Sequence, residues 1–388
     1  MIKYPLSDDT WGQEEIDAIN EVVASRRFTM GAKTKEFEEK FANYFGSKYA
    51  VMVNSGSSAN LIAIAALIFS GRLNRGDEII VPAVSWSTTY YPLYQYGLKL
   101  IFVDIDLNTL NIDKQQIESA ITPKTKAIFT VNLLGNPNEY DEIINICDKH
   151  GLILIEDNCE AMGAKYNNKF TGTFGIIGTF STFYSHHICT MEGGIAITDD
   201  EELYHYMLSL RAHGWTRDIP HSSKIYQKSP SEFYESYNFI LPGYNVRPLE
   251  IEAAVGIEQL KKLERFVSIR RQNAEYFREL CHNLNNIVIQ EEIGQSSWFG
   301  FSIVLINDLR GQRDNLINEL KKNDIEVRPI VAGNITFNKS VKYLDYRINN
   351  RLKNADYIHV NGYFIGNHSK DLKKEIDQFY DLFSSFMD

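Results

Sequence analysis

The sequence has few cysteines, and none of them stands in a metal-binding spacing. Four cysteines are spread over 388 residues, and no two form a Cys-x-x-Cys pair. Zinc ions and iron–sulfur clusters are usually held by such closely spaced thiolates, and a chain of this length does not need a disulfide framework. We therefore expect no metal site and four reduced thiols: Cys147, Cys159, Cys189 and Cys281.

The sequence also lacks an apolar run long enough to cross a membrane. Its longest apolar stretch extends from Leu61 to Phe69, whereas a membrane-spanning helix needs roughly 20 apolar residues. Residues 1–5 do not resemble the apolar core of a signal peptide. We expect a cytoplasmic protein that does not act on membranes.

Basic residues are outnumbered by acidic ones. Forty Lys and Arg residues against fifty Asp and Glu residues give a net charge of −10. Proteins that bind nucleic acid usually carry a strong basic patch, so the composition argues against a nucleic-acid partner. An anionic small substrate stays possible, because a few local arginines suffice to bind it.

What the sequence contains is a regular alternation of strand-like and helix-like segments, which predicts an α/β fold. Continuous apolar runs such as 153–155 suit a mostly parallel sheet that is covered on both faces. Helices fit residues 113–120 and 139–150. Strands are predicted at 49–53, 78–81, 100–103, 127–131 and 152–155.

The length of the chain suits two domains. A long helical tract near 249–283 is followed by a smaller α/β alternation, with strands at 299–305 and 326–330. We place the boundary near residue 250, which gives a large domain of residues 1–250 and a small C-terminal domain of residues 251–388. Residues 216–240 are polar and aromatic without a clear period and are expected to form a loop region.

Two turns at the ends of predicted strands could bind a ligand. Gly56 and its flanking serines lie between a strand and a helix, where the backbone can approach a phosphate closely. Asp157 ends a buried strand, and ligands of open α/β sheets sit at such ends. Taken alone, the first motif is better explained as a plain glycine turn. The second is explained equally well as a solvated aspartate.

Two adjacent histidines, His186 and His187, precede the segment 192–194. On a strand their side chains would point to opposite faces, so only one of them could face a given site. The pKa of histidine suits acid–base work, although a single histidine is more often structural. No His-Glu-x-x-His pattern supports a metal site.

Taken together, these segments resemble the sugar aminotransferase family of fold-type I pyridoxal-phosphate enzymes, and within it the nucleotide-sugar 3-dehydratases. The family shows a phosphate turn like 55–57, an acidic pair like Glu156-Asp157, and Ser-x-x-x-x-Lys shortly before Glu-Gly-Gly. Here Ser181 matches the serine, and His186 stands in place of the lysine. The resemblance covers nearly the whole chain and implies an aspartate aminotransferase-like fold. Further matching segments are 84–91, 184–187 and 241–248.

The resemblance implies where the phosphate of pyridoxal 5′-phosphate, or of its pyridoxamine form, would bind. Gly56, Ser57 and Ser181 would contact it, and Asn245 would reach it from a partner subunit. We therefore expect at least a homodimer.

The resemblance also implies how the cofactor ring would be held. Trp86 would stack on the ring, and Asp157 would hold its protonated nitrogen. Glu160 stands where relatives often have glutamine, near the ring hydroxyl or His186, and has no assigned role. Imidazole cannot form the covalent bond with the cofactor that lysine forms, so we expect the cofactor to be bound without a lysine.

The implied reaction removes the C3 hydroxyl of a GDP-linked 4-keto-6-deoxy sugar. L-glutamate would be the amino donor, and the products would be the 4-keto-3,6-dideoxy sugar and ammonia. His186 would be the acid–base group, an effect worth about 10²–10⁴-fold in rate. Arg217 and Arg247 are candidates for the sugar's diphosphate, although ordinary surface salt bridging explains Arg217 equally well. The residues do not distinguish a mannose-type hexose from a heptose.

Three other interpretations stay open. A nucleotide-sugar 4-aminotransferase would need a lysine at position 186. A dehydratase of the CDP-sugar type works with an iron–sulfur cluster, and the scattered cysteines argue against it. A catalytically inactive protein of the same fold would have no reason to keep Trp86, Asp157 and Ser181 together.

Overall fold

The computed structural model describes residues 2–387, and an eight-stranded sheet lies at its centre. The strand order is β1-β9-β8-β5-β4-β2-β3-β13. All neighbours from β13 to β8 pair in parallel, whereas β9 is antiparallel to both β8 and β1. The predicted α/β fold with a mostly parallel central sheet is confirmed. The strands are β1 (Tyr49–Val53), β2 (Glu78–Pro82), β3 (Lys99–Val103), β4 (Thr125–Val131), β5 (Ile153–Asp157), β8 (Ile177–Ser181), β9 (Gly194–Thr198) and β13 (Tyr346–Ile348).

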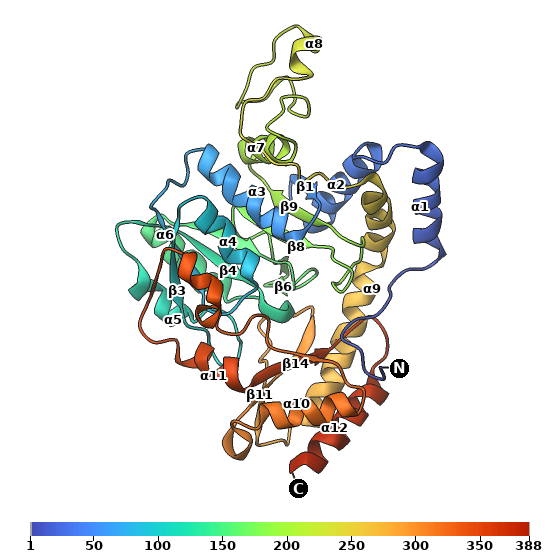
Figure 1. Cartoon of the computed structure of the whole chain (residues 1–388), viewed down its shortest axis with the longest axis vertical. Coiled ribbons are helices and arrows are strands. Elements are labelled where there is room, and N and C mark those ends of the chain that lie inside the picture. Colours follow the sequence, from blue (N-terminus) through green and yellow to red (C-terminus); the bar gives the residue numbers. More distant parts are fainter. Residues whose placement is uncertain (1, 388) are drawn as a thin grey trace.

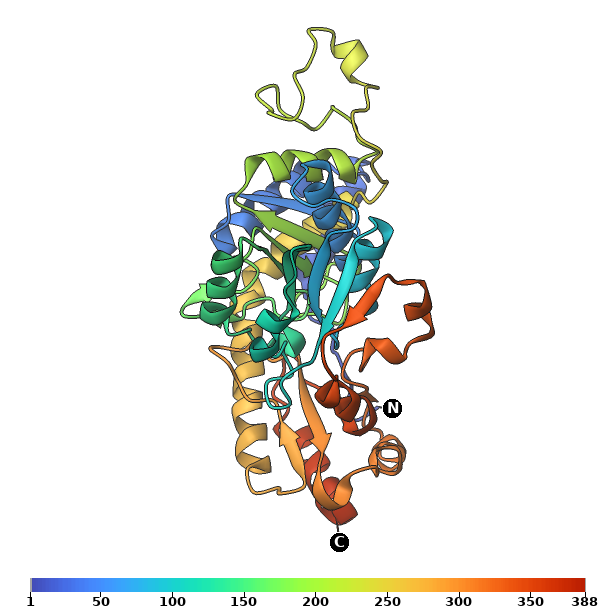
Figure 2. The ribbon, with the colours of Figure 1, turned by 90° about the vertical axis from the view of Figure 1, so that its left-hand side faces the viewer.

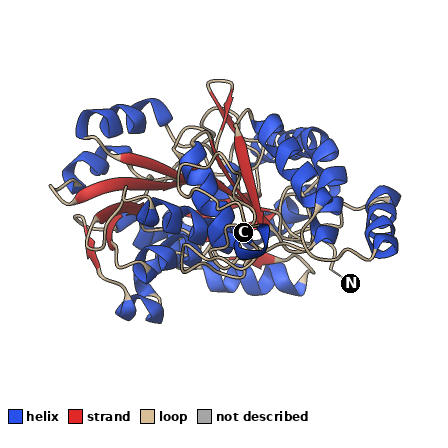
Figure 3. Ribbon diagram, turned by 90° about the horizontal axis from the view of Figure 1, so that it is seen from above, coloured by secondary structure: helices blue, strands red, loops and turns tan. Residues whose placement is uncertain are grey.

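Helices flank this sheet (Figure 3), and α3 (Gly56–Phe69) is the one that positions the site. Between Ala59 and Leu67 every residue of α3 except Leu61 is buried, because a helix that is apolar all round must be covered on all sides. It packs on β8 and β9, which brings its N-terminus to the middle of the sheet. The other helices of this layer are α1 (Gln13–Ser25), α2 (Ala32–Phe45), α4 (Ser87–Gln95), α5 (Lys114–Ile117), α6 (Tyr140–His150) and α7 (Glu201–Arg211).

A second, antiparallel sheet has the strand order β10-β11-β14-β12. Phe277, Phe301 and Phe379 are fully buried between this sheet and its helices, and the N-terminal Tyr4 joins the same core. Its strands are β10 (Ile287–Ile289), β11 (Gly300–Leu305), β12 (Val327–Arg328) and β14 (Gly362–Gly366). The helices that accompany it are α9 (Glu250–Cys281), α10 (Arg313–Lys322), α11 (Lys353–Asn361) and α12 (Lys373–Met387). A separate two-stranded hairpin is formed by β6 (Lys165–Tyr166) and β7 (Lys169–Phe170).

The division into residues 1–250 and 251–388 stays a prediction. Two segments cross it in the structure: β13 extends the large sheet beside β3, and Tyr4 lies in the core of the small layer. Both crossings connect the two layers. The long helix α9 also runs along both of them (Figure 2).

Residues 213–248 are here called the arm, and its middle part around α8 projects away from the rest of the molecule (Figure 1). The arm is loop apart from α8 (Glu232–Glu235), as the lack of periodicity predicted. Its fold is held by Glu235, whose carboxylate accepts hydrogen bonds from Thr216 (2.7 Å) and the Ser229 amide (2.8 Å). Within residues 2–387, no helix is both long and apolar enough to span a membrane.

Candidate active site

The turn that begins α3 and the end of β8 form a tight cradle. A Cβ atom on Gly56 would lie 2.7 Å from Ser181 Cβ and 2.9 Å from Cys159 Sγ, so only glycine fits here. Ser57 donates a hydrogen bond to Thr88 Oγ1 (2.9 Å). The first amides of a helix have no partner within the helix and favour an anion. The structure thus brings Gly56, Ser57 and Ser181 together at a place that suits a phosphate.

The two carboxylates at the end of β5 face opposite sides of the sheet. Glu156 accepts hydrogen bonds from Tyr140 Oη (2.6 Å) and from three main-chain amides of the 172–175 loop, and it therefore anchors that loop. Asp157 accepts hydrogen bonds from Asn60 Nδ2 (2.9 Å) and Thr89 Oγ1 (2.7 Å). Because successive side chains of a strand point to opposite faces, only Asp157 of this pair lies on the α3 side of the sheet.

Trp86 lies at the start of the turn that begins α4, and Thr89 of this turn binds Asp157. Thr89 bonds both Asp157 and Ser85 Oγ (2.8 Å), which fixes the turn against the end of β5. The Trp86 side chain is 58% exposed. A large aromatic ring that the chain itself leaves uncovered is available to stack on a planar ligand.

Glu160 lies three residues after Asp157 and is partly buried. Its Oε2 accepts a hydrogen bond from the Leu134 amide (3.0 Å). Removal from water, together with the negative charge of Asp157, raises the pKa of Glu160 to about 7. Its carboxyl group can therefore change charge near neutral pH.

The two histidines do not lie on a strand, and that expectation was wrong. β8 ends at Ser181, and the His186 amide donates to the Phe183 carbonyl (2.8 Å) within a turn. What separates the histidines is hydrogen bonding. His187 is fully buried, and its Nε2 donates to the Ser297 carbonyl (3.1 Å).

The His186 ring makes no such hydrogen bond within the described part of the chain. Its Nδ1 is buried and has no hydrogen-bond partner within the described part of the chain. The ring lies edge-to-face against Phe299 (5.1 Å between centroids) and Phe183 (5.9 Å). Burial, and then the positive charges of Arg270 and Arg328, lower the pKa of His186 to about 3. The imidazole is thus neutral at physiological pH and can accept a proton.

Three predicted residues lie apart from this cluster, at the base of the arm. The Arg217 guanidinium stacks 4.3 Å from the Trp215 ring centroid, and Arg247 lies 5.6 Å from it. Arg247 Nε donates to Asn245 Oδ1 (3.0 Å). Arg217 forms no salt bridge within residues 2–387, so the alternative of surface ion pairing finds no support there. No hydrogen bond of the described residues joins these three to Asp157 or His186.

The structure adds residues that the sequence did not indicate. Asn60 follows Gly56 by one helical turn, a spacing that could have revealed it. Arg270, Phe299 and Arg328 lie more than 80 positions from His186 and leave no local pattern beside it.

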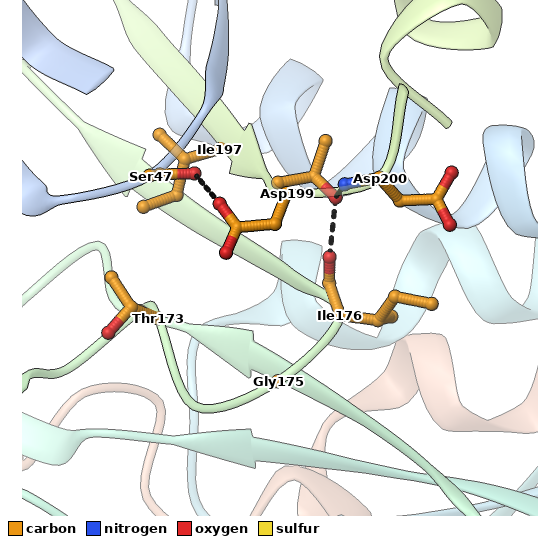
Figure 4. Close-up of a pocket in the computed structure, with 9 residues that line it drawn as sticks. Ser47, Thr173, Gly175, Ile176, Ile197, Asp199 and Asp200 are labelled. Carbon is orange, nitrogen blue, oxygen red and sulfur yellow. Dashed lines mark hydrogen bonds between the residues drawn. The ribbon is translucent and has the colours of Figure 1, made fainter. Parts of the chain in front are cut away.

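A separate pocket of about 270 Å³ lies elsewhere (Figure 4), lined by side chains that include Thr173. Its two carboxylates already have partners. Asp199 accepts hydrogen bonds from Ser47 Oγ (3.2 Å) and the Lys48 amide (2.8 Å), while Asp200 caps α7 and pairs with an arginine. This pocket therefore does not compete with the cluster around His186. Residues 2–387 contain no group of three potential metal ligands.

Comparison with known proteins gives a consistent result. Residues 9–381 match the model of the DegT/DnrJ/EryC1/StrS aminotransferase family. The chain is 58% identical over 381 residues to GDP-4-keto-6-deoxy-D-mannose 3-dehydratase of Escherichia coli O55:H7 (strain CB9615 / EPEC), covering 97% of this chain and 98% of that protein.

Two solved structures of such a dehydratase are similar over nearly the whole chain. The E. coli enzyme with bound hydrated PLP superposes with a TM-score of 0.97 at 57% identity, covering 98% of this chain and 99% of that one. A dehydratase with a trapped PLP-glutamate geminal diamine gives a TM-score of 0.96 at 56% identity, covering 98% and 100%.

Proposed function

This chain belongs to the DegT/DnrJ/EryC1/StrS aminotransferase family, and from that premise we propose that it is a C3-dehydratase of a GDP-linked 4-keto-6-deoxy sugar. The cofactor is pyridoxal 5′-phosphate in exchange with pyridoxamine 5′-phosphate, L-glutamate is the amino donor, and ammonia is a product. The observation that carries the proposal is His186, a neutral imidazole with a free Nδ1 at the position where the family has lysine.

The residues present fit the cofactor. The cradle at Gly56, which a Cβ atom would fill, suits its phosphate together with Ser57 and Ser181. Asp157 is held by Asn60 and Thr89 on the same side of the sheet and suits a protonated ring nitrogen, with Trp86 stacked on the ring. When bound, the cofactor supplies an amino group that condenses with the sugar ketone and a ring that accepts electrons.

His186 does the acid–base work in this proposal. Its neutral ring takes a proton from the carbon next to the amino group and hands it to the C3 hydroxyl, which leaves as water. One base that reaches both atoms suffices, since the same proton is taken up and released. His187 is not proposed for this role, because it is fully buried and its Nε2 is bound to the Ser297 carbonyl.

The absence of lysine at position 186 separates this activity from its alternative. A 4-aminotransferase needs a lysine amine that binds the cofactor covalently and returns a proton to C4. Imidazole cannot form that covalent bond, so elimination at C3 is the outcome that His186 favours. The same residue predicts that gel filtration strips the cofactor more readily than from relatives with the lysine.

The arm would complete the substrate side. We place the sugar diphosphate at Arg217 and Arg247, and we place Asn245 at the phosphate of a partner subunit's cofactor in a homodimer. Exposed apolar side chains on the arm, Phe233 (87%) and Tyr237 (71%), support contact with a second copy. A hexose of the mannose type or a related heptose fits this scheme, and a GDP-sugar of this kind is handled in the cytoplasm.

Two assays test the proposal. Incubation with pyridoxal phosphate and L-glutamate should release 2-oxoglutarate, and an inactive binding protein would release none. Ammonia is then measured with a panel of nucleotide-linked 4-keto sugars that includes the hexose and heptose forms. Formation of a 4-amino sugar without ammonia release would show an aminotransferase and refute the dehydratase.

A further inference from the structure

We propose that Arg270 is a positioning residue, which holds the wall beside His186 and keeps that imidazole uncharged between proton transfers. The inference rests on the function proposed above. It concerns a residue of α9 that does not belong to the cofactor cradle and lies in the small layer of the fold.

Arg270 is seated without a counter-ion. Its side chain is 2% exposed, and its Nη1 donates to the carbonyl oxygens of Phe299 (3.1 Å), Trp298 (3.5 Å) and Asn367. All three acceptors are main-chain groups, and no carboxylate of residues 2–387 pairs with it. Buried charges are normally paired. Because no carboxylate neutralises this guanidinium, its positive charge acts on the neighbouring groups.

The carbonyls that Arg270 holds belong to the segment that walls His186. Phe299 packs against both histidine rings, with centroids 5.1 Å and 5.8 Å away. Trp298, just before it, has a φ of 47°, a left-handed conformation that costs a non-glycine residue energy. The hydrogen bonds of Arg270 to both residues stabilise this conformation from behind.

The opposite side of the wall is held as well. The Phe299 amide donates to the Leu134 carbonyl (2.9 Å), and the Ser297 amide donates to the Gly135 carbonyl (2.9 Å). Leu134 is the residue whose amide Glu160 binds. The main chain of Phe299 is therefore held between Arg270 and the turn after β4, with its ring against His186.

Within residues 2–387, the charged and titratable groups that act around His186 come from three elements. They are Arg270 from α9, Arg328 from β12 and the neighbouring His187 of its own turn. Burial is the largest cause that disfavours protonation of His186, and both arginines add to it. Arg328 is exposed to water, which screens its charge, whereas the charge of Arg270 is not screened.

This arrangement suits a group that must release the proton it has just taken. Once His186 is protonated, the nearby guanidinium makes the imidazolium a stronger acid. The proton then passes readily to the departing C3 hydroxyl, and the ring returns to its neutral state. No oxidant or further reactant is involved, because one proton is accepted and the same proton is given.

Three variants separate charge from hydrogen bonding. Arg270→Met removes the charge and keeps the length of the side chain, while Arg270→Lys keeps the charge. Arg328→Met is the matched control, since it removes an exposed charge near the same ring. Two quantities are measured in the full chain: the NMR titration of His186 without cofactor, identified by its loss in His186→Asn, and the pH profile of ammonia release.

We expect Arg270→Met to raise the titration midpoint of His186 by at least about one pH unit, a tenfold change in its protonation equilibrium. We also expect kcat to fall about tenfold with little change in KM, and the acid limb of the pH profile to move upward. Arg270→Lys should keep the wild-type midpoint and most of kcat, and Arg328→Met should cause a smaller shift.

An unchanged midpoint in a folded Arg270→Met protein, or equal shifts in the Met and Lys variants, would overturn the proposal. If Arg270→Met does not fold, Arg270→Gln serves as the neutral variant: a raised midpoint supports the role of the charge, and an unchanged midpoint overturns it. Should the wild-type protein release no ammonia from any sugar, the proposed function fails, while the titration still tests Arg270.

Discussion

Around Gly56 and Asp157 the chain satisfies its own polar groups, whereas the arm leaves large side chains in water. Asp157 has bonds from Asn60 and Thr89, and a single Cβ atom would overfill the cradle at Gly56. On the arm, Phe233 is 87% exposed. The proposed cofactor contacts thus lie mostly within one chain, with Asn245 expected from a partner subunit, whereas the proposed substrate contacts lie on the exposed arm. Substitutions on the two sides should consequently fail in different ways.

The largest effect is expected at His186, on the cofactor side. His186→Asn keeps a polar side chain of similar size but removes the titrating group, so ammonia release should fall by roughly 10²-fold or more. His187→Asn is the matched control, because it loses only the bond to Ser297 and should act through packing. Steady-state rates of both variants decide this. If the His187 variant were the inactive one, the assignment of the two histidines would be reversed.

Replacing the same histidine by lysine sharpens the comparison. His186→Lys restores an amine that can bind the cofactor covalently, so borohydride should trap a pyridoxyl label that the wild-type chain lacks. Most of the dehydratase activity should be lost, because the amine replaces the neutral imidazole. Mass spectrometry of the reduced protein measures the label. A label on any lysine of the wild-type chain would contradict the proposed binding mode.

The next largest effect is expected at the cradle around Gly56. Gly56→Ala places a Cβ atom within 2.7 Å of Ser181 Cβ, and such overpacking costs about 1–3 kcal/mol. We expect the affinity for pyridoxal phosphate to fall roughly 10-fold or more, as measured by the absorbance of bound cofactor. Ser70→Ala, at the other end of α3, is the control and should bind normally. Equal affinities in the two variants would show that the cradle does not hold the phosphate.

On the arm a smaller loss is expected, and of a different kind. Arg247→Ala removes a guanidinium that lies beside Trp215 and Asn245, so KM for the GDP-sugar should rise about 10-fold, since a charged hydrogen bond contributes about 1.5 kcal/mol. The free energy of unfolding should change by less than about 0.5 kcal/mol, because the side chain is partly exposed and lies outside the core. A lower kcat with an unchanged KM would instead place Arg247 outside the substrate site.

The smallest effect concerns pH and Glu160, whose pKa is raised to about 7 by burial. Its protonated form stabilises the folded state relative to the unfolded chain, in which a glutamate ionises near its ordinary pKa. This contribution is complete below that ordinary value and is lost as pH rises through about 7. Between pH 5 and pH 8 the free energy of unfolding of Glu160→Gln should therefore rise by about 1 kcal/mol relative to that of the wild type. The effect is smaller than the full pKa shift implies, because the partial exposure of Glu160 screens it. Denaturant unfolding at both pH values measures it, and a constant difference would contradict the raised pKa.

The sequence by itself determined the elements that depend on neighbouring residues. The alternation of apolar runs predicted β1, β2, β3, β4 and β5 within a residue or two, because strand and helix periods are local. The turn at Gly56, the strand end at Asp157 and the histidine in place of lysine were also visible there, since each stands beside the element that positions it.

Only the tertiary structure decided which histidine is free and what surrounds it. The expectation that His186 and His187 alternate on a strand was wrong, because β8 ends at Ser181 and a turn follows. The two rings differ because Ser297, 110 residues away, accepts a hydrogen bond from one of them. Glu160 and Arg270 likewise acquire their surroundings from distant segments. Burial and hydrogen bonding between such segments set the charge of these groups, and no pattern in the local sequence records them.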